Sequence, residues 1–195
     1  MNVSYHSIVP GLWIIWLVYW AASSRSVKPT RRRESAVSRA AHIVPLTVAA
    51  LLIALPRFPG QALEGRFLPN APLVYGIGAC IVVAGLAFTV WARIHLGRNW
   101  RGTVTLKYGH ELVRSGPYRI VRHPIYTGLL VVFAGSAIAR SEWRGIVAVF
   151  IAFAALWRKL RLEERWMVER WMVETFGNEY LEYRVGVAAL ILFVY

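Results

Sequence analysis

The stretch FLPNAPLVYGIGACIVVAGLAFTVWA, residues 67–92, decides what kind of fold this chain can adopt. No charged side chain occurs in it, and its apolar residues continue beyond the length of a typical buried core helix. A helix rises about 1.5 Å per residue, so about 20 apolar residues cross a hydrocarbon core roughly 30 Å thick. We therefore expect this run to span a membrane.

Further runs of low charge lie on either side of this span. They cover residues 8–22, 40–56, 123–139 and 145–157. Small residues follow the first run, as in a cleaved signal peptide, but no positive segment precedes it, so we interpret it as a span. The last run is short, and it crosses completely only if Arg158 and Lys159 extend to the interface.

The sequence therefore predicts an all-α fold, a polytopic membrane bundle of about five transmembrane helices with a C-terminal amphipathic cytoplasmic helix. Only residues 140–144 separate the last two spans, which must form a tight hairpin. Residues 185–195 are too few to span, and we expect them to pack against the other helices or to lie in the interface. We treat residues 1–195 as one domain, with three spans in 1–92 and the chemistry-bearing half in 93–195.

Composition and charge support a membrane location. Hydrophobic residues make up 57% of the chain and charged residues 17%, against about 45–50% and about 25% in soluble domains. The net charge is +13, with the basic residues dense in residues 25–39 and 93–122 and sparse in 57–66. The positive-inside rule then places the N-terminus outside and the polar segments on the cytoplasmic face. The charge is divided among loops without a recognisable module, so we expect no nucleic-acid partner.

The polar segment before the fourth run ends in a helix start that suits an anion. Pro124 is expected at the first helical position, which leaves Arg122 and His123 at the mouth of the helix. Together with Arg119, the free N–H groups of a helix N-terminus favour a carboxylate or phosphate. The alternative is that the arginines determine topology or contact head groups and that His123 caps the helix. Tyr126, one turn further on, is either a ligand contact or an interfacial tyrosine.

The second polar segment, residues 158–184, carries paired carboxylates. Glu163 and Glu164 are surrounded by basic residues, which is typical of a solvated helix with ion pairs four residues apart. In a pocket at the membrane face, such a glutamate instead accepts hydrogen bonds from a ribose or an ammonium group. A tandem repeat, RWMVE at 165–169 and again at 170–174, follows the pair. The two copies cannot present the same helix face, since five residues exceed one turn.

Three motifs in order resemble the isoprenylcysteine carboxyl methyltransferase family of integral membrane methyltransferases. They are GHELVRSGPYRIVRHPIYTG at 109–128, LEERWMVE at 162–169 and ETFGNEYLEYR at 174–184. The resemblance implies methyl transfer from S-adenosylmethionine at the cytoplasmic face, without a Gly-rich dinucleotide loop. It nominates two catalytic residues, Arg122 and Glu164. The cofactor-binding residues that it nominates are Tyr118, His123, Pro124, Tyr126, Glu163 and Glu164.

The resemblance also implies the acceptor, the carboxylate of a lipophilic, prenylcysteine-like substrate that reaches the site from the membrane lipids. Within the enzyme class, the alternative is N-methylation of a phospholipid amine, which requires a base such as His110, Glu111 or His123. A different class is a non-catalytic membrane protein of transport or assembly. The sequence leaves the oligomeric state open, although Gly76, Gly78 and Gly85 permit close helix packing within or between chains.

Two departures from the family pattern concern the second half. The tandem repeat shifts either the paired glutamates or the Phe176-Gly177 segment relative to the usual frame, and we retain Glu163 and Glu164 because Arg161 and Leu162 keep the family context. The tail after Arg184 lacks the expected prolines. We also expect Gly177 to end a helix.

Overall fold

A computed structural model describes residues 7–23, 35–55, 58, 60, 63–97, 113–167 and 177–190. In this part of the chain the regular secondary structure is helical, and isolated bridge residues occur beside it, such as the pair Arg66 and Glu142. The α-helices are α1 (Ile8–Ser23), α2 (Ala36–Ala54), α3 (Pro72–Leu96), α4 (Pro124–Arg140), α5 (Trp143–Met167) and α7 (Asn178–Gly186), with a 3-10 turn, η5 (Gly116–Arg119), before α4. The all-α prediction is confirmed.

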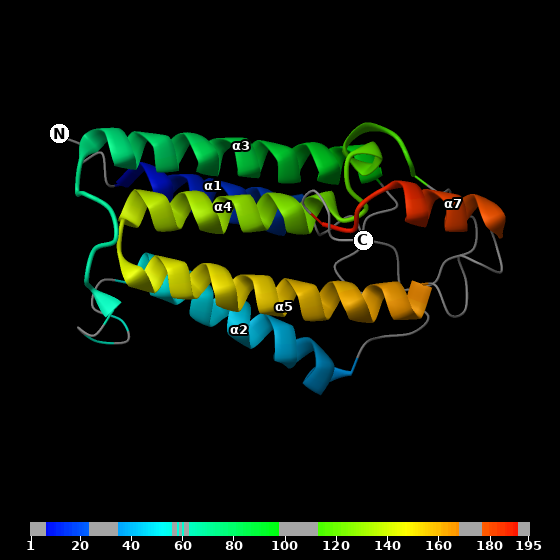
Figure 1. Ribbon diagram of the computed structural model, residues 1–195, viewed down its shortest axis with the longest axis horizontal. Coiled ribbons are helices and arrows are strands. Elements are labelled where there is room, and N and C mark those ends of the chain that lie inside the picture. The colour runs from blue at the N-terminus through cyan, green and yellow to red at the C-terminus, as the bar shows by residue number, and fades with distance from the viewer. Residues whose placement is uncertain are drawn as a thin grey trace.

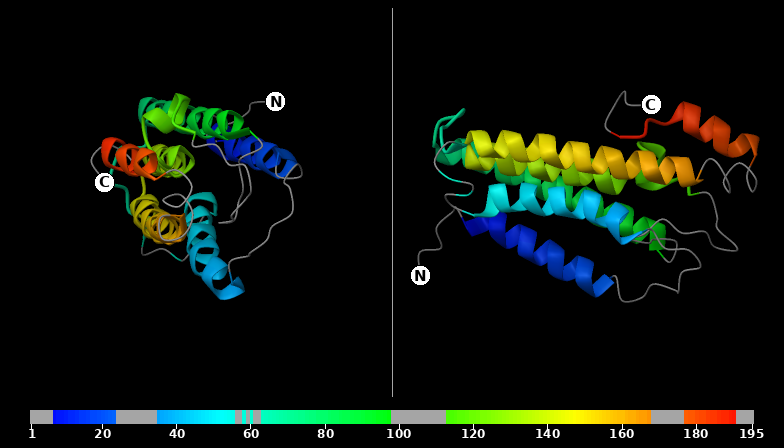
Figure 2. Two further views of the ribbon diagram at one scale, coloured as in Figure 1. Left: turned by 90° about the vertical axis from the view of Figure 1, so that its right-hand side faces the viewer. Right: turned by 90° about the horizontal axis from the view of Figure 1, so that it is seen from below.

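The helices α1 to α5 lie side by side, and each runs opposite to the one before it (Figure 1). Seen along the bundle, α4 lies centrally between the α1 and α3 side and the α2 and α5 side (Figure 2). The helix α7 lies beyond the bundle at the end where α4 begins and α5 ends. This arrangement brings the two polar segments, which are separated in sequence by a helical hairpin, to the same end of the molecule.

Glycine residues let α3 and α4 approach at backbone distance. A Cβ atom on Gly78 would lie 2.6 Å from the carbonyl oxygen of Gly135, and one on Gly85 would lie 2.9 Å from that of Gly128. The two pairs are spaced by seven residues on each helix, so they mark one face of each. Of the glycines proposed for close packing, Gly78 and Gly85 serve within the chain, whereas a Cβ on Gly76 would meet open space.

Side-chain hydrogen bonds attach α1 to the α3 and α4 pair. The indole N–H of Trp16 donates to the Thr89 hydroxyl at 2.8 Å, and that of Trp13 donates to the Ser136 hydroxyl at 3.1 Å. Each of these bonds joins polar groups of two helices, and hydrogen bonds of this kind hold helices together in an apolar environment. Two tryptophan side chains therefore attach α1 to α3 and α4.

At the end opposite α7, charged side chains join α2, α4 and α5. The Glu142 carboxylate, in the turn of the α4–α5 hairpin, accepts from Arg140 at 3.1 Å and from Arg144. Arg140 also donates to the carbonyl oxygen of Ile53 and Arg144 to that of Leu55, each at 2.6 Å, at the C-terminal end of α2. We call this group the hairpin clamp.

The fifth helix differs from its sequence-based interpretation. We expected a short span at 145–157 followed by a separate amphipathic helix, but α5 is a single helix of 25 residues that continues to Met167. Charged residues end an apolar run without ending a helix, because Arg, Lys and Glu are good helix formers. Gly177 precedes α7, with φ at 50°. The tandem repeat begins within α5, and its residues 168–174 lie outside the described residues.

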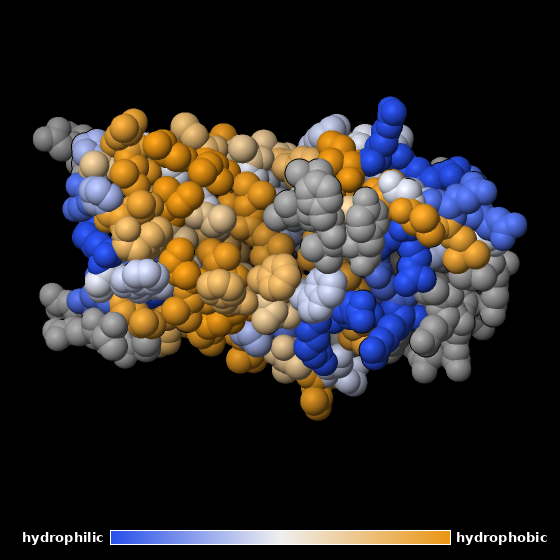
Figure 3. Space-filling model, in the orientation of Figure 1, coloured by the Kyte–Doolittle hydropathy of each residue, from blue (hydrophilic) through white to orange (hydrophobic). Residues whose placement is uncertain are grey.

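The surface of the bundle is largely apolar along its middle and polar at the α7 end (Figure 3). Two helices, α2 and α3, are long and apolar enough to cross a membrane, and α1 and α4 are shorter apolar helices. Large side chains such as Ile15, Val83 and Phe150 are more than 40% exposed on three different helices. In water such exposure would be costly, whereas lipid accommodates it.

Candidate active site at the polar end of the bundle

The site is organised around the start of α4. Pro124 occupies the first helical turn, as expected, and His123 stands at the position before it. The His123 side chain makes no capping hydrogen bond, so helix capping does not explain this residue. Arg122 precedes it with 8% of its surface exposed, although it carries a charge. The sequence RHP therefore directs two basic side chains into the end of the bundle.

Arg122 pairs with a glutamate from the end of α5. Its Nη2 atom lies 2.9 Å from Glu164 Oε1, and the side chains of the two residues are 5% and 12% exposed. Buried charges are stable only when they are paired, because desolvation of each ion costs several kcal/mol. Arg122 and Glu164, the two catalytic residues that the family resemblance nominates, are therefore in direct contact although they lie 42 positions apart in the sequence.

His123 lies between the two glutamates. Its Nδ1 atom is 3.7 Å from Glu163 Oε2, and its Nε2 atom is 3.6 Å from Glu164 Oε1. Its ring stacks on that of Tyr126, with centroids 5.5 Å apart. The Tyr126 hydroxyl donates to Glu163 Oε1 at 2.5 Å, and Lys159 Nζ lies 3.9 Å from the same oxygen. Both glutamates are therefore held by more than one partner.

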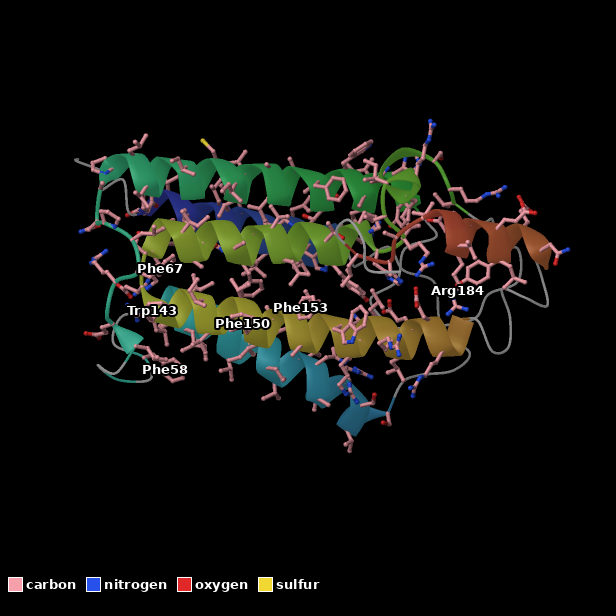
Figure 4. The ribbon with its side chains drawn as sticks, in the orientation of Figure 1. Phe58, Phe67, Trp143, Phe150, Phe153 and Arg184 are labelled. Atoms are coloured by element: carbon pink, nitrogen blue, oxygen red, sulfur yellow. The ribbon has the colours of Figure 1, made fainter. Side chains whose placement is uncertain are left out.

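The electrostatic environment keeps Glu164 ionised. Burial by itself raises the pKa of Glu164, but the nearby His123 ring and the positive charges of Arg122 and Arg184 outweigh burial, so that its pKa falls below the ordinary value. Arg184 belongs to α7, at the same end of the molecule (Figure 4). A carboxylate that stays charged inside a largely buried cluster is suited to accept hydrogen bonds from a bound ligand.

Backbone groups of residues 184, 188 and 189 complete the cluster, and no sequence motif predicts this. The N–H of Arg122 donates to the carbonyl oxygen of Ala188 at 2.8 Å, and that of His123 donates to Ala189 at 3.0 Å. Arg122 Nη1 donates to the carbonyl oxygen of Arg184. The backbone N–H groups of Arg122 and His123 are therefore engaged within the chain, and the side chains of these two residues can still meet an anion.

The expectation that residues 185–195 pack against other helices holds for the part that is described. Ala189 and Leu190 are each 1% exposed and pack in an apolar cluster with Leu130, Leu156 and Leu160. These residues belong to α4 and α5. The apolar side chains anchor the segment whose carbonyl groups hold Arg122 and His123.

The remaining nominated residues are placed differently. Tyr118 is 8% exposed, and its ring stacks on that of His95 at 6.4 Å. Burial raises the pKa of Tyr118, so its hydroxyl stays protonated. Arg119 is exposed and is not among the contacts of the cluster. His110 and Glu111 lie outside the described residues.

The fold and the cluster define a class, namely a membrane-type helical bundle with a buried polar site at one end. Residues 73–174, which run from the second residue of α3 to beyond the end of α5, match the family model described as phospholipid methyltransferase. This chain belongs to that family.

The named relatives and a solved structure agree with this assignment. Protein-S-isoprenylcysteine O-methyltransferase A of Arabidopsis thaliana is 28% identical over 151 residues, which make up 74% of this chain and 73% of that protein. A probable protein-S-isoprenylcysteine O-methyltransferase of Oryza sativa subsp. indica is 27% identical over 153 residues, 75% of this chain and 76% of that protein. The structure of the eukaryotic intramembrane Ras methyltransferase ICMT (isoprenylcysteine carboxyl methyltransferase) covers 100% of this chain and 70% of its own, with a TM-score of 0.58 and 19% identity. The resemblance found in the sequence motifs is confirmed.

Proposed function

We propose that this protein transfers a methyl group from S-adenosylmethionine to the carboxylate of a lipophilic, prenylcysteine-like substrate, forming a methyl ester. The observation that carries the proposal is the buried cluster of Arg122, His123, Glu163 and Glu164 at one end of an apolar bundle. Family membership and the names of the plant relatives support the reaction and the acceptor.

The proposed setting is a five-span protein whose polar end faces the cytoplasm. The alternating directions of α1 to α5 support five crossings (Figure 1), and the excess of Lys and Arg in residues 25–39 and 93–122 supports the orientation. A lipophilic substrate then approaches through the bilayer, while a water-soluble methyl donor approaches from the cytoplasm. Such a site brings a lipid-soluble acceptor and a water-soluble donor together at the membrane surface.

The residues of the cluster fit S-adenosylmethionine by their chemistry. The donor has a carboxylate, an ammonium group and ribose hydroxyls, and the cluster offers a guanidinium and an imidazole for the first and two carboxylates for the others. Arg122 Nε is buried and makes no hydrogen bond within the described residues, which leaves a donor for a ligand carboxylate. When bound, S-adenosylmethionine supplies an activated methyl group on a positively charged sulfur.

We assign the roles of the chain's residues accordingly. Arg122 and His123 hold the carboxylate of the methyl donor, and Glu163 or Glu164 holds its ribose or ammonium group. Tyr118, Pro124 and Tyr126 form the wall of the pocket. Through its contacts with the donor, Arg122 acts together with Glu164 as the catalytic pair that orients it.

Carboxyl methylation requires little acid–base catalysis from these residues. An ionised carboxylate is already a nucleophile, so the chain needs no general base. The task of the cluster is to hold charged partners in a water-poor site and in a fixed geometry. The many contacts of Glu163 and Glu164 restrict their rotamers, which supports positioning as the main contribution of the protein.

The family description favours a second candidate, N-methylation of a phospholipid amine. An amine must be neutral to attack, so this reaction requires a base near the acceptor. His123 is assigned above to the donor carboxylate and so is not free to serve as this base, and His110 and Glu111 lie outside the described residues. The role assignment therefore favours the carboxylate acceptor.

The test compares the two acceptors directly. The protein, purified in lipid nanodiscs, is incubated with S-adenosylmethionine carrying a labelled methyl group and with either an S-farnesylcysteine analogue or phosphatidylethanolamine. Label on the farnesylcysteine analogue that base releases as methanol supports ester formation. Base-stable label on the phospholipid alone refutes it in favour of the amine.

A binding measurement separates either enzyme from a non-catalytic membrane protein. We expect saturable binding of S-adenosylhomocysteine, the demethylated donor, in calorimetry. The double variant with His123→Ala and Glu164→Ala should abolish this binding. If the wild-type protein binds neither the donor nor its demethylated product, both enzymatic proposals are wrong.

A further inference from the structure

The C-terminal part of the chain lies along the segment that leads into α4. Three kinds of contact join the two segments, and the contacts follow the same order along both of them. Glu179 pairs with Arg114, the Tyr183 hydroxyl donates to the carbonyl oxygen of Tyr118, and the carbonyl groups of residues 184, 188 and 189 accept from Arg122 and His123. We call residues 183–190 the C-terminal strap.

These contacts differ in how much they can contribute to holding the C-terminal strap in place. The side chains of Arg114 and Glu179 are 41% and 51% exposed, and exposed ion pairs contribute little because water screens them. The backbone bonds from Arg122 and His123 depend on where the strap lies. The bond from Tyr183 to Tyr118, at 2.7 Å and partly buried, is the side-chain contact that fixes the strap at the turn of η5.

The Tyr183 hydroxyl is a dependable donor. Burial raises the pKa of Tyr183 to about 12, so the group stays protonated at any pH at which the protein would work. The distance is typical of a good O–H···O bond. The acceptor is a backbone carbonyl, which no side-chain rotation can withdraw.

We propose that Tyr183 is a positioning residue that, through the C-terminal strap, holds Arg122 and His123 in the geometry that binds the methyl donor. This inference rests on the proposed function and concerns the same site. Tyr183 acts from outside the pocket, since its hydroxyl is engaged with Tyr118. Its effect passes from Tyr183 to the neighbouring carbonyl of Arg184 and from there to the guanidinium of Arg122.

The expected consequence is a change in affinity. Arg122 and His123 hold the same carboxylate before and during the reaction, so their misplacement weakens uniform binding and raises KM without lowering kcat. Removal of one partly buried hydrogen bond corresponds to a factor of about three to ten. We expect Tyr183→Phe to raise the KM for S-adenosylmethionine by this factor, with kcat changed less than about twofold.

The experiment measures binding as well as turnover. Calorimetry gives the Kd of S-adenosylhomocysteine for the wild-type protein, for Tyr183→Phe and for Glu182→Gln in nanodiscs. Glu182 is an exposed neighbour on the same helix and serves as the matched control. The Kd should rise about three- to tenfold in Tyr183→Phe and stay unchanged in Glu182→Gln. Hydrogen exchange of the Arg122 and His123 amides, which the strap protects, should accelerate in Tyr183→Phe alone.

Several results would overturn the proposal. These are an unchanged Kd in Tyr183→Phe, an equal rise in Glu182→Gln, or a fall in kcat at constant KM. If Tyr183→Phe does not fold, the wild-type protein still decides, because binding of S-adenosylhomocysteine should slow exchange of the Arg122 and His123 amides and an unchanged rate would contradict us. Failure of the proposed function looks different, since the wild-type protein would then not bind S-adenosylhomocysteine.

Discussion

Replacement of Gly78 by alanine tests the backbone contact between α3 and α4 with the smallest possible change. The added Cβ would lie 2.4 Å from the backbone nitrogen of Ala139 and 2.6 Å from the carbonyl oxygen of Gly135. Both neighbours are backbone atoms, so no rotamer change relieves the overlap. The helices must separate by about 1 Å, the difference between 2.4 Å and the 3.4 Å at which ordinary van der Waals contact begins.

This separation also loosens the apolar core cluster that contains Val82 and Val132, which are both 0% exposed. Overpacking in a tight core costs about 1–3 kcal/mol, and the close backbone neighbours place Gly78→Ala toward the upper end. For a chain of this length, about 2–3 kcal/mol lowers the midpoint of thermal unfolding by roughly 4–12 °C. Differential scanning fluorimetry of the protein in detergent measures this shift.

Gly76 supplies the matched control. It lies two residues away on the same helix, and a Cβ there would meet nothing within 4 Å. Gly76→Ala should leave the midpoint unchanged or raise it slightly, because alanine is the better helix former by about 1 kcal/mol. Equal midpoints for Gly76→Ala and Gly78→Ala would refute the reasoning, since the two variants differ only in what the methyl group meets.

Three further outcomes are expected. Glu164→Gln leaves the buried Arg122 charge uncompensated and should weaken binding of S-adenosylhomocysteine at least tenfold in calorimetry, whereas Glu179→Gln, which removes an exposed pair, should change it less than twofold. Because the pKa of Glu164 lies below its ordinary 4.5, its stabilisation is complete above that value and is lost as the pH falls through the lowered pKa. The unfolding midpoint of the wild-type protein should therefore fall more steeply below about pH 4.5 than that of Glu164→Gln, and parallel curves would contradict this. Glu142→Gln, in the hairpin clamp, should lower the unfolding midpoint without altering affinity for S-adenosylhomocysteine, and a loss of affinity would show that the two ends of the bundle are coupled.

The sequence was informative about the helices because apolar runs are a local property. The runs at 8–22 and 123–139 correspond to α1 and α4 within one or two residues. The error at α5 has a physical cause, since hydropathy reports where lipid contact ends, whereas helix formation continues through Arg158 and Lys159. The hairpin clamp was missed because its arginines were counted only as loop charges, and their partners are carbonyl groups nearly 90 residues away.

The candidate site was predictable in its side chains but not in its scaffold. The motifs nominated Arg122, His123, Tyr126 and the paired glutamates, and the structure brings these together. Their catalytic and binding roles stay predictions. The C-terminal strap contributes backbone carbonyls, which any residue possesses, so no pattern of side chains could have indicated that Ala188 and Ala189 complete the site.

The hairpin clamp fixes one end of α5 and so acts as a pivot for that helix. One end of the helix is fixed to α2 and α4 by Arg140, Arg144 and Glu142, while Glu164 lies at the far end, about 33 Å away at about 1.5 Å per residue. A tilt of about 5° at the pivot therefore moves Glu164 by about 3 Å, which is enough to separate it from Arg122. The distance between Arg122 and Glu164 is therefore sensitive to the tilt of α5, and the packing of Leu156 and Leu160 against Leu130 and Leu190 holds that tilt.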